Sequence, residues 1–408
     1  MSADDIDTTA SLTSQPLQLR VAPTSRVQRM SDGEDYGVLP TDQWKGQLVF
    51  DKPCGAASSK GTCWLLDDLK AWNLVTLGLA FELVETTPGT LLLRHMTNVE
   101  VDRDPEIAAR EASFLVSWLL RHHPCIQELD VKSPEQIWLP ETGQLSLQTL
   151  SVLFNALASN KRVSSLTVDV KHDPDAKVAL LCEVLKKNRY IKLLCIEIEN
   201  GESANEILHA LTVNAAVAEV DMTLRVAATE ETMAAFSDML SGNNSITSIS
   251  AILHVDQPGQ FMDSVAQGMS SNRLIVNFKC WAGNHTRVPS DVFESVRRNK
   301  SALNRAVEFV LQRREDRHSA ECFELFSGRS CLTSHLTEVA GMSDDEARLE
   351  EASAELRLRE KYFVLTGIVR RSVICWKDDV TQIDALNPDC WRAIASYLRI
   401  TDASGAYR

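Results

Sequence analysis

The chain has 408 residues, 44% of them hydrophobic, and a formal net charge of −14 at pH 7. This length and apolar content allow one long repeat array or two to three ordinary domains, without support from disulfides or cofactors. The negative charge argues against nucleic acid or an anionic membrane surface as the main partner.

Residues 1–60 contain many Ser, Thr, Asp, Gly and Pro and show no periodic apolar pattern, so we expect a disordered lead-in. The first 14 residues lack the layout of a secretory signal, and no run approaches the ~18 apolar residues of a membrane span. The ten cysteines are scattered. We interpret them as reduced thiols in a cytoplasmic protein.

An apolar pattern begins near residue 63. Leu65, Leu69, Trp72 and Leu74 fit a short amphipathic helix, and an apolar strand at 91–93 follows a Pro-Gly turn. We assign residues 61–104 as an N-terminal cap.

Residues 105–300 contain one sequence pattern that repeats in about six units. Each unit has a helical run, an Asn, and apolar residues three, six and eight positions later, and the Asn recurs every 26–29 residues. The Asn positions are Asn160, Asn188, Asn214, Asn243, Asn272 and Asn299. In the first unit His123 replaces the Asn, before Ile126, Leu129 and Val131, and residues 134–146 are read as an insertion. A period of this length predicts a stacked solenoid.

Because side chains alternate between the two faces of a strand, we expect the residues six and eight positions after each Asn to lie in the core. Strands joined by crossover helices must be parallel, so the strands are expected to line the concave side of a curved α/β solenoid and the helices its convex side.

The spacing apolar-x-x-apolar-x-apolar after a helix resembles the leucine-rich repeat family, and most closely its helix-containing, ribonuclease-inhibitor-like branch. Ile126-x-x-Leu129-x-Val131 and Ile191-x-x-Leu194-x-Ile196 are the clearest copies, and the resemblance covers roughly residues 105–305. The family's Asn or Cys three residues beyond the last Leu is not matched, so the side-chain ladder that it builds is not predicted from those positions. They hold Pro134, Lys171, Glu199, Arg225, His254 and Gly283.

Residues 301–408 are expected to be a helical cap and tail. A capping helix is predicted at 301–311, and Ser343 with Glu346 forms a capping box that opens a long charged helix to about residue 364. A last helix resembles the opening of an F-box, which implies contact with a ubiquitin-ligase adaptor through Leu386, Pro388, Trp391, Ile394 and Leu398. The alternative is an ordinary amphipathic helix that buries Trp391, Ile394, Tyr397 and Leu398.

No motif for catalysis or phosphate binding is present, so we expect neither an enzyme nor a cofactor. His122, His123 and Cys125 cluster in the sequence, but no second ligand pair at zinc-like spacing accompanies them. We interpret them as turn residues and predict no metal site.

Function is expected on the strand residues that alternate away from the core, six of which are acidic and two basic. The predicted binding residues are Glu128, Asp130, Asp169, Glu197, Glu219, Asp221, Lys279 and Trp281. The leading hypothesis is a non-enzymatic interaction scaffold whose concave face binds a protein or peptide of basic character. One alternative is an F-box-like substrate receptor, and another is a sensing arm related to the repeats of innate-immune receptors. The partner's identity and the oligomeric state stay open.

Overall fold

The computed structural model describes residues 54–55, 62–79, 81–96, 105–131, 144–170, 174–227, 229–282, 288–367 and 388–403. The expected lead-in therefore lies outside the described residues except for Cys54 and Gly55, as does the predicted insertion up to residue 143.

The described strands form one eight-stranded sheet in chain order, β1 to β8. The strands are β1 Phe81–Thr87, β2 Thr90–His95, β3 Ile126–Val131, β4 Ser165–Val170, β5 Leu193–Ile198, β6 Glu219–Leu224, β7 Ser248–Leu253 and β8 Asn277–Trp281. The β1–β2 pair is an antiparallel hairpin, and its turn uses the positive φ of Gly89, +86°. Each later strand pairs in parallel with the one before it. The sequence pattern revealed β2 but not β1.

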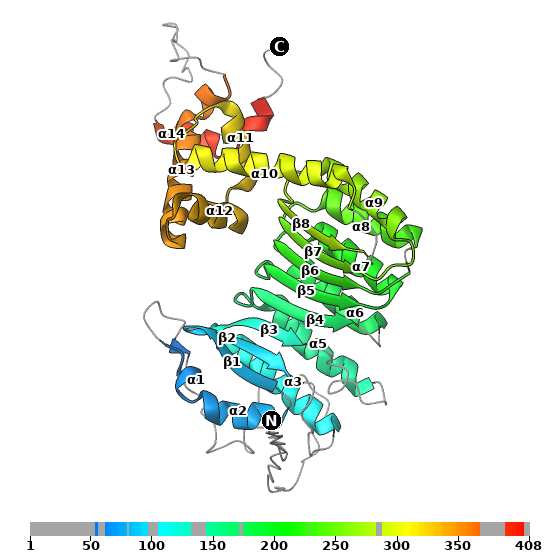
Figure 1. Ribbon diagram of the computed structural model, residues 1–408. Coiled ribbons are helices and arrows are strands. Elements are labelled where there is room, and N and C mark those ends of the chain that lie inside the picture. The colour runs from blue at the N-terminus through cyan, green and yellow to red at the C-terminus, as the bar shows by residue number, and fades with distance from the viewer. Residues whose placement is uncertain are drawn as a thin grey trace, which may run out of the picture. The chain divides into compact units, whose positions relative to one another are not determined.

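Helices alternate with the strands and lie along one face of the sheet (Figure 1). They are α3 Pro105–His122, α5 Gln144–Ser159, α6 Pro174–Lys187, α7 Gly201–Val213, α8 Glu230–Gly242 and α9 Pro258–Ser271. The residues six and eight positions after the Asn of each unit face these helices. Leu194 and Ile196, for example, are 0% and 4% exposed. The fold is a leucine-rich-repeat-like solenoid. The predicted α/β class, parallel strands and inward positions are confirmed.

A ladder of buried Asn side chains joins the units. In one rung, Oδ1 of Asn243 accepts the backbone N–H groups of Ser245 and Ile246, both at 2.7 Å. Its Nδ2 donates to the carbonyls of Leu211 and Asn214 in the preceding unit, at 2.6 and 3.0 Å. Asn188 makes all four of these bonds. Asn160, Asn214 and Asn272 each accept the same two N–H groups and donate to one carbonyl of the preceding unit. A ladder is thus present, but it is built by the Asn that precedes the strand.

The N-terminal cap begins with two short helices where we expected one. Instead of a single helix there are α1 Trp64–Asp67 and α2 Leu69–Leu77, separated at Asp68. Trp72 is 1% exposed, whereas Leu74, which we placed on the apolar stripe, is 56% exposed. The break after α1 changes the direction of the second helix, so that Trp72 and Thr76 form the buried side of α2.

The described C-terminal region is helical. It comprises α10 Ser290–Val310, α11 Arg317–Phe326, α12 Ser330–Ala340, α13 Asp344–Leu365, α14 Pro388–Ala395 and the 3-10 helix η4 Ile400–Ala403. The capping helix starts eleven residues earlier than predicted, because Val292, Ser295 and Asn299 continue its buried face against the last repeat. The capping box of Ser343 with Glu346 is present.

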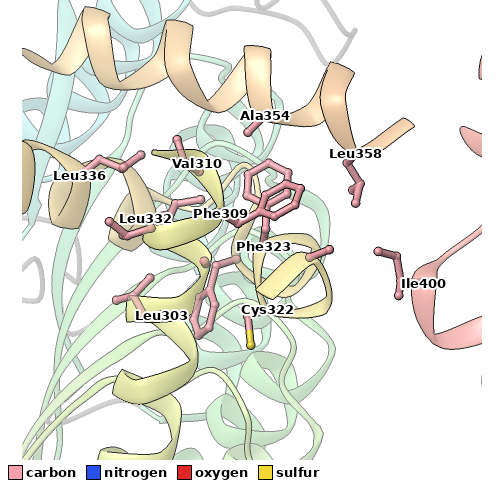
Figure 2. Packing of buried hydrophobic residues seen from close by; sticks show 14 of the residues in the cluster. Leu303, Phe309, Val310, Cys322, Phe323, Leu332, Leu336, Ala354, Leu358 and Ile400 are labelled. Atoms are coloured by element: carbon pink, nitrogen blue, oxygen red, sulfur yellow. The ribbon is translucent and has the colours of Figure 1, made fainter. Parts of the chain in front are cut away.

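A second apolar core holds these helices together (Figure 2). The rings of Phe309 on α10 and Phe323 on α11 stack with centroids 5.2 Å apart. Leu332 of α12, Leu358 of α13 and Ile400 of η4 close around them. Within the described part of the chain, no helix is both long and apolar enough to cross a bilayer.

Candidate functional site

The side chains of β3 to β8 that point away from the helices form the strand face. Because the parallel strands pair in register, equivalent positions line up across them in rows. One row runs from Asp130 through Thr167, Cys195, Asp221 and Ser250 to Lys279. The row before it carries Glu128, Ser165, Leu193, Glu219, Ser248 and Asn277, and the row after it carries Asp169, Glu197, Thr223, Ile252 and Trp281. The structure therefore brings the predicted binding residues onto one surface.

The exposed negative charge of the strand face is concentrated on β6. Glu219 and Asp221 are exposed, and Lys279, two strands away in the row of Asp221, is exposed as well. With ~4.8 Å between adjacent strands, Lys279 lies roughly 10 Å from Asp221 across the face. The β6 carboxylates are thus available to a ligand.

Four of the predicted acids are less available than expected. Asp169 is 3% exposed and is already engaged in an interaction. Glu197 forms an ion pair with Arg225 at 3.0 Å, and Glu128 accepts a hydrogen bond from Thr86 at 2.7 Å. Asp130 is half-buried and also engaged. The negative potential is therefore more local than a count of acids predicts, because it centres on Glu219 and Asp221.

An exposed apolar pair lies beside these carboxylates. Trp281 is 72% exposed and Ile252 is 40% exposed, and the two are paired in register across β7 and β8. Trp281 was a predicted binding residue. Ile252 was not, because an alternating strand pattern shows which face a side chain takes but not whether a neighbour covers it.

The predicted adaptor contact is only partly visible. Leu386 lies outside the described residues, and the side chains of Pro388 and Trp391 on α14 are not described. Ile394 and Leu398 are each 37% exposed, and Tyr397 is 88% exposed. The alternative expectation that these three pack inward is wrong, because α14 ends at Ala395 and the buried anchor is Ile400 of η4.

A second group of side chains that could bind a ligand lies between the N-terminal cap and the first repeat. His123 and Cys125, which we interpreted as turn residues, are each 1% exposed, whereas His122 is exposed. Cys54 and Cys63 join them, and the ligand atoms of the four residues all lie within 4.8 Å of one another. The prediction missed this cluster because Cys54 falls in the expected lead-in. The available signal was Cys-x8-Cys combined with a distant His-x-Cys.

Comparisons with known proteins name no family. No protein-family model and no curated protein matches the chain. Among solved structures, "Leiomodin-1 Actin-Binding Site 2 (ABS2)" matches 39% of this chain and 94% of its own at 16% identity, with a TM-score of 0.32. The tropomodulin C-terminal domain of Caenorhabditis elegans matches 49% of this chain and 97% of its own at 12% identity, with a TM-score of 0.27. Scores this low carry no functional argument.

Proposed function

We propose that this chain is a non-enzymatic interaction scaffold whose strand face binds a protein segment of basic character. The observation that carries the proposal is Trp281, 72% exposed beside Ile252 on a surface that also presents Glu219 and Asp221.

An exposed Trp on a rigid sheet is suited to anchor a partner. Large aromatic side chains bury about 150–250 Å² on contact, which at about 25 cal/mol per Å² amounts to roughly 4–6 kcal/mol before the costs of association. Little ordering cost falls on the scaffold, because the strands of Ile252 and Trp281 are already fixed by the ladder of backbone hydrogen bonds. Trp281 and Ile252 thus supply an apolar centre.

The carboxylates define the partner's charge. Glu219 and Asp221 lie two strands from Trp281, on β6, and are exposed to solvent. Charges at the rim of an interface mainly raise the association rate and select against wrong partners. The partner that fits is a segment with one apolar side chain for Trp281 and Ile252 and with Lys or Arg residues nearby.

A displayed library of random peptides, selected on the immobilised full chain, tests the proposal. We expect enriched peptides to combine basic residues with an aromatic or aliphatic anchor, and to lose at least tenfold in affinity on Trp281→Ala. The double variant Glu219→Lys, Asp221→Lys should abolish selection of the basic residues while the chain stays folded.

Leu356→Ser is the matched control, because Leu356 is an exposed apolar residue, 56% accessible, on α13 and far along the chain from the strand face. It should bind the same peptides as the unmodified chain. Peptides that bind the Trp281 and β6 variants unchanged would overturn the strand face as the binding site.

A further inference from the structure

Four buried ligand-type side chains converge between the N-terminal cap and the first repeat. Cys54, Cys63, His123 and Cys125 are 7%, 1%, 1% and 1% exposed. The Sγ atoms of Cys54 and Cys125 are 4.0 Å apart, and Sγ of Cys63 is 3.4 Å from Nδ1 of His123. Three separate segments of the chain supply them: the stretch at 54, the residue preceding α1, and the turn between α3 and β3.

We propose that Cys54, Cys63, His123 and Cys125 bind one zinc ion that fastens the cap to the repeat array. Tetrahedral zinc with Zn–S near 2.3 Å and Zn–N near 2.0–2.1 Å places two sulfurs about 3.8 Å apart, and a sulfur and a nitrogen about 3.5 Å apart. The two distances in the cluster fall close to these values. Three thiolates and an imidazole complete four-coordination, which is the closed arrangement of a structural site.

A disulfide explains the cluster less well. None of the described cysteines forms a disulfide in this structure, and a bond between any two of the three would leave one thiol and the imidazole without a role. Burial of cysteines as small apolar residues accounts for single positions such as Cys182. It does not account for four ligand atoms meeting at one point.

Zinc binding at this cluster exchanges protons for a cation and needs no redox partner. On binding, Zn–S bonds replace the S–H bonds, the thiol protons pass to solvent, and no electron is transferred.

An aromatic shell keeps water away from this point. The ring of Trp64 meets the His123 ring edge-on, with centroids 5.2 Å apart, and Trp118 lies 5.1 Å from it. Trp72 stacks on Trp118 at 5.9 Å. A dry apolar shell strengthens metal–ligand interactions and slows exchange.

The position of His123 in the repeat indicates what a metal ion would connect. His123 occupies the place that Asn holds in the later units, where the carboxamide bonds to the carbonyls of the preceding unit. The first unit has the cap rather than a repeat before it. A metal ligand at this position links β3 to the cap through Cys54 and Cys63, where the Asn would have linked two repeats.

Metal analysis of the full chain, purified under reducing conditions, tests the proposal. We expect one zinc per chain, lost in Cys63→Ser and in His123→Ala. The matched controls His122→Ala and Cys182→Ser should keep the zinc. Replacement of zinc by Co²⁺ should give the visible bands of tetrahedral cobalt and a thiolate charge-transfer band.

Loss of zinc through misfolding is distinguished by treating the unmodified chain with a chelator. The thermal midpoint should fall on chelation and recover on addition of Zn²⁺ but not of Mg²⁺. The proposal is overturned if the fully reduced chain takes up no zinc or cobalt, if zinc persists in the double variant of Cys63 and His123, or if mass analysis shows a disulfide within the cluster.

Discussion

The carboxamide nitrogen of Asn188 donates to the backbone carbonyl of Asn160, the equivalent residue one unit earlier, at 2.9 Å. The same Asn also holds its own turn, accepting from the N–H groups of Tyr190 and Ile191. Each rung therefore satisfies buried backbone groups in two successive units at once, which apolar packing cannot do. Stability of the solenoid should depend on this one position in each repeat.

Asn243→Ala should lower the free energy of unfolding by about 2–4 kcal/mol, because two buried N–H donors lose their partner and the carbonyls of Leu211 and Asn214 each lose one donor. Urea denaturation followed by circular dichroism measures the loss. Asn244→Ala is the control: the adjacent side chain is exposed, and its carbonyl, which accepts from Arg329, is kept. Equal midpoints for the two variants would contradict the role of the ladder.

Arg298 ends the ladder in place of a further repeat. Its guanidinium donates to the carbonyls of Ser270, Met269 and Asn272, at the end of α9. Arg298→Ala should cost about 1.5–3 kcal/mol, since hydrogen bonds from a charged donor are lost at a half-buried site. Arg297→Ala, which removes the exposed pair with Glu294, should leave the unfolding midpoint nearly unchanged, because exposed ion pairs contribute little to stability. A comparable loss in both would show that the cap acts only through packing.

At Gly268, α9 lies directly against the backbone of α8. A Cβ there would lie 2.6 Å from the Ser237 carbonyl oxygen and 2.9 Å from Cβ of Leu240. Gly268→Ala should therefore cost about 1–3 kcal/mol despite the better helix propensity of Ala. Gly259→Ala, in the first turn of the same helix with open space around it, should be neutral or stabilising by up to about 1 kcal/mol. Thermal unfolding of the pair tests the contact.

The exposed residues after α14 can be tested without disturbing the core. Truncation before residue 384 would remove Ile400, which is 0% exposed, and its loss alone should cost about 2–5 kcal/mol. Tyr397→Ser, at a residue 88% exposed, should leave stability within about 0.5 kcal/mol. If this region contacts a ligase adaptor, the Tyr397 variant should lose that adaptor in a purified binding assay while remaining folded; unchanged binding would exclude Tyr397 from the contact.

Acid should weaken the N-cap of α11. Asp316 accepts the N–H of Ser319 at 2.8 Å, and this bond lowers the pKa of the carboxyl group. A lowered pKa gives stability that is present above the unfolded value, about 3.9, and is lost as the pH falls through the folded value. The cost of Asp316→Ala, about 0.5–2 kcal/mol at pH 7, should shrink below about pH 4. Asp316→Asn, which keeps a cap without titrating, should show no such step.

The repeat was readable because it is local. The three, six and eight offsets after each Asn report which strand residues face the core, as Leu166 and Val168 show with exposures of 0% and 1%. The capping box of Ser343 and Glu346 was equally readable, since its partners are three residues apart. Short-range periodicity and capping thus determined the solenoid, its parallel strands and the long charged helix from the sequence alone.

Tertiary structure decided what depends on distant contacts. The burial of Asp169, the exposure of Trp281 and the meeting of Cys54 with Cys125, 71 residues apart in the chain, follow from how separate segments pack. Nothing in the local pattern around Cys54 indicates a neighbour at Cys125. Periodicity specifies the face that a residue takes, whereas availability and ligand geometry are set by whichever remote segment covers or joins that face.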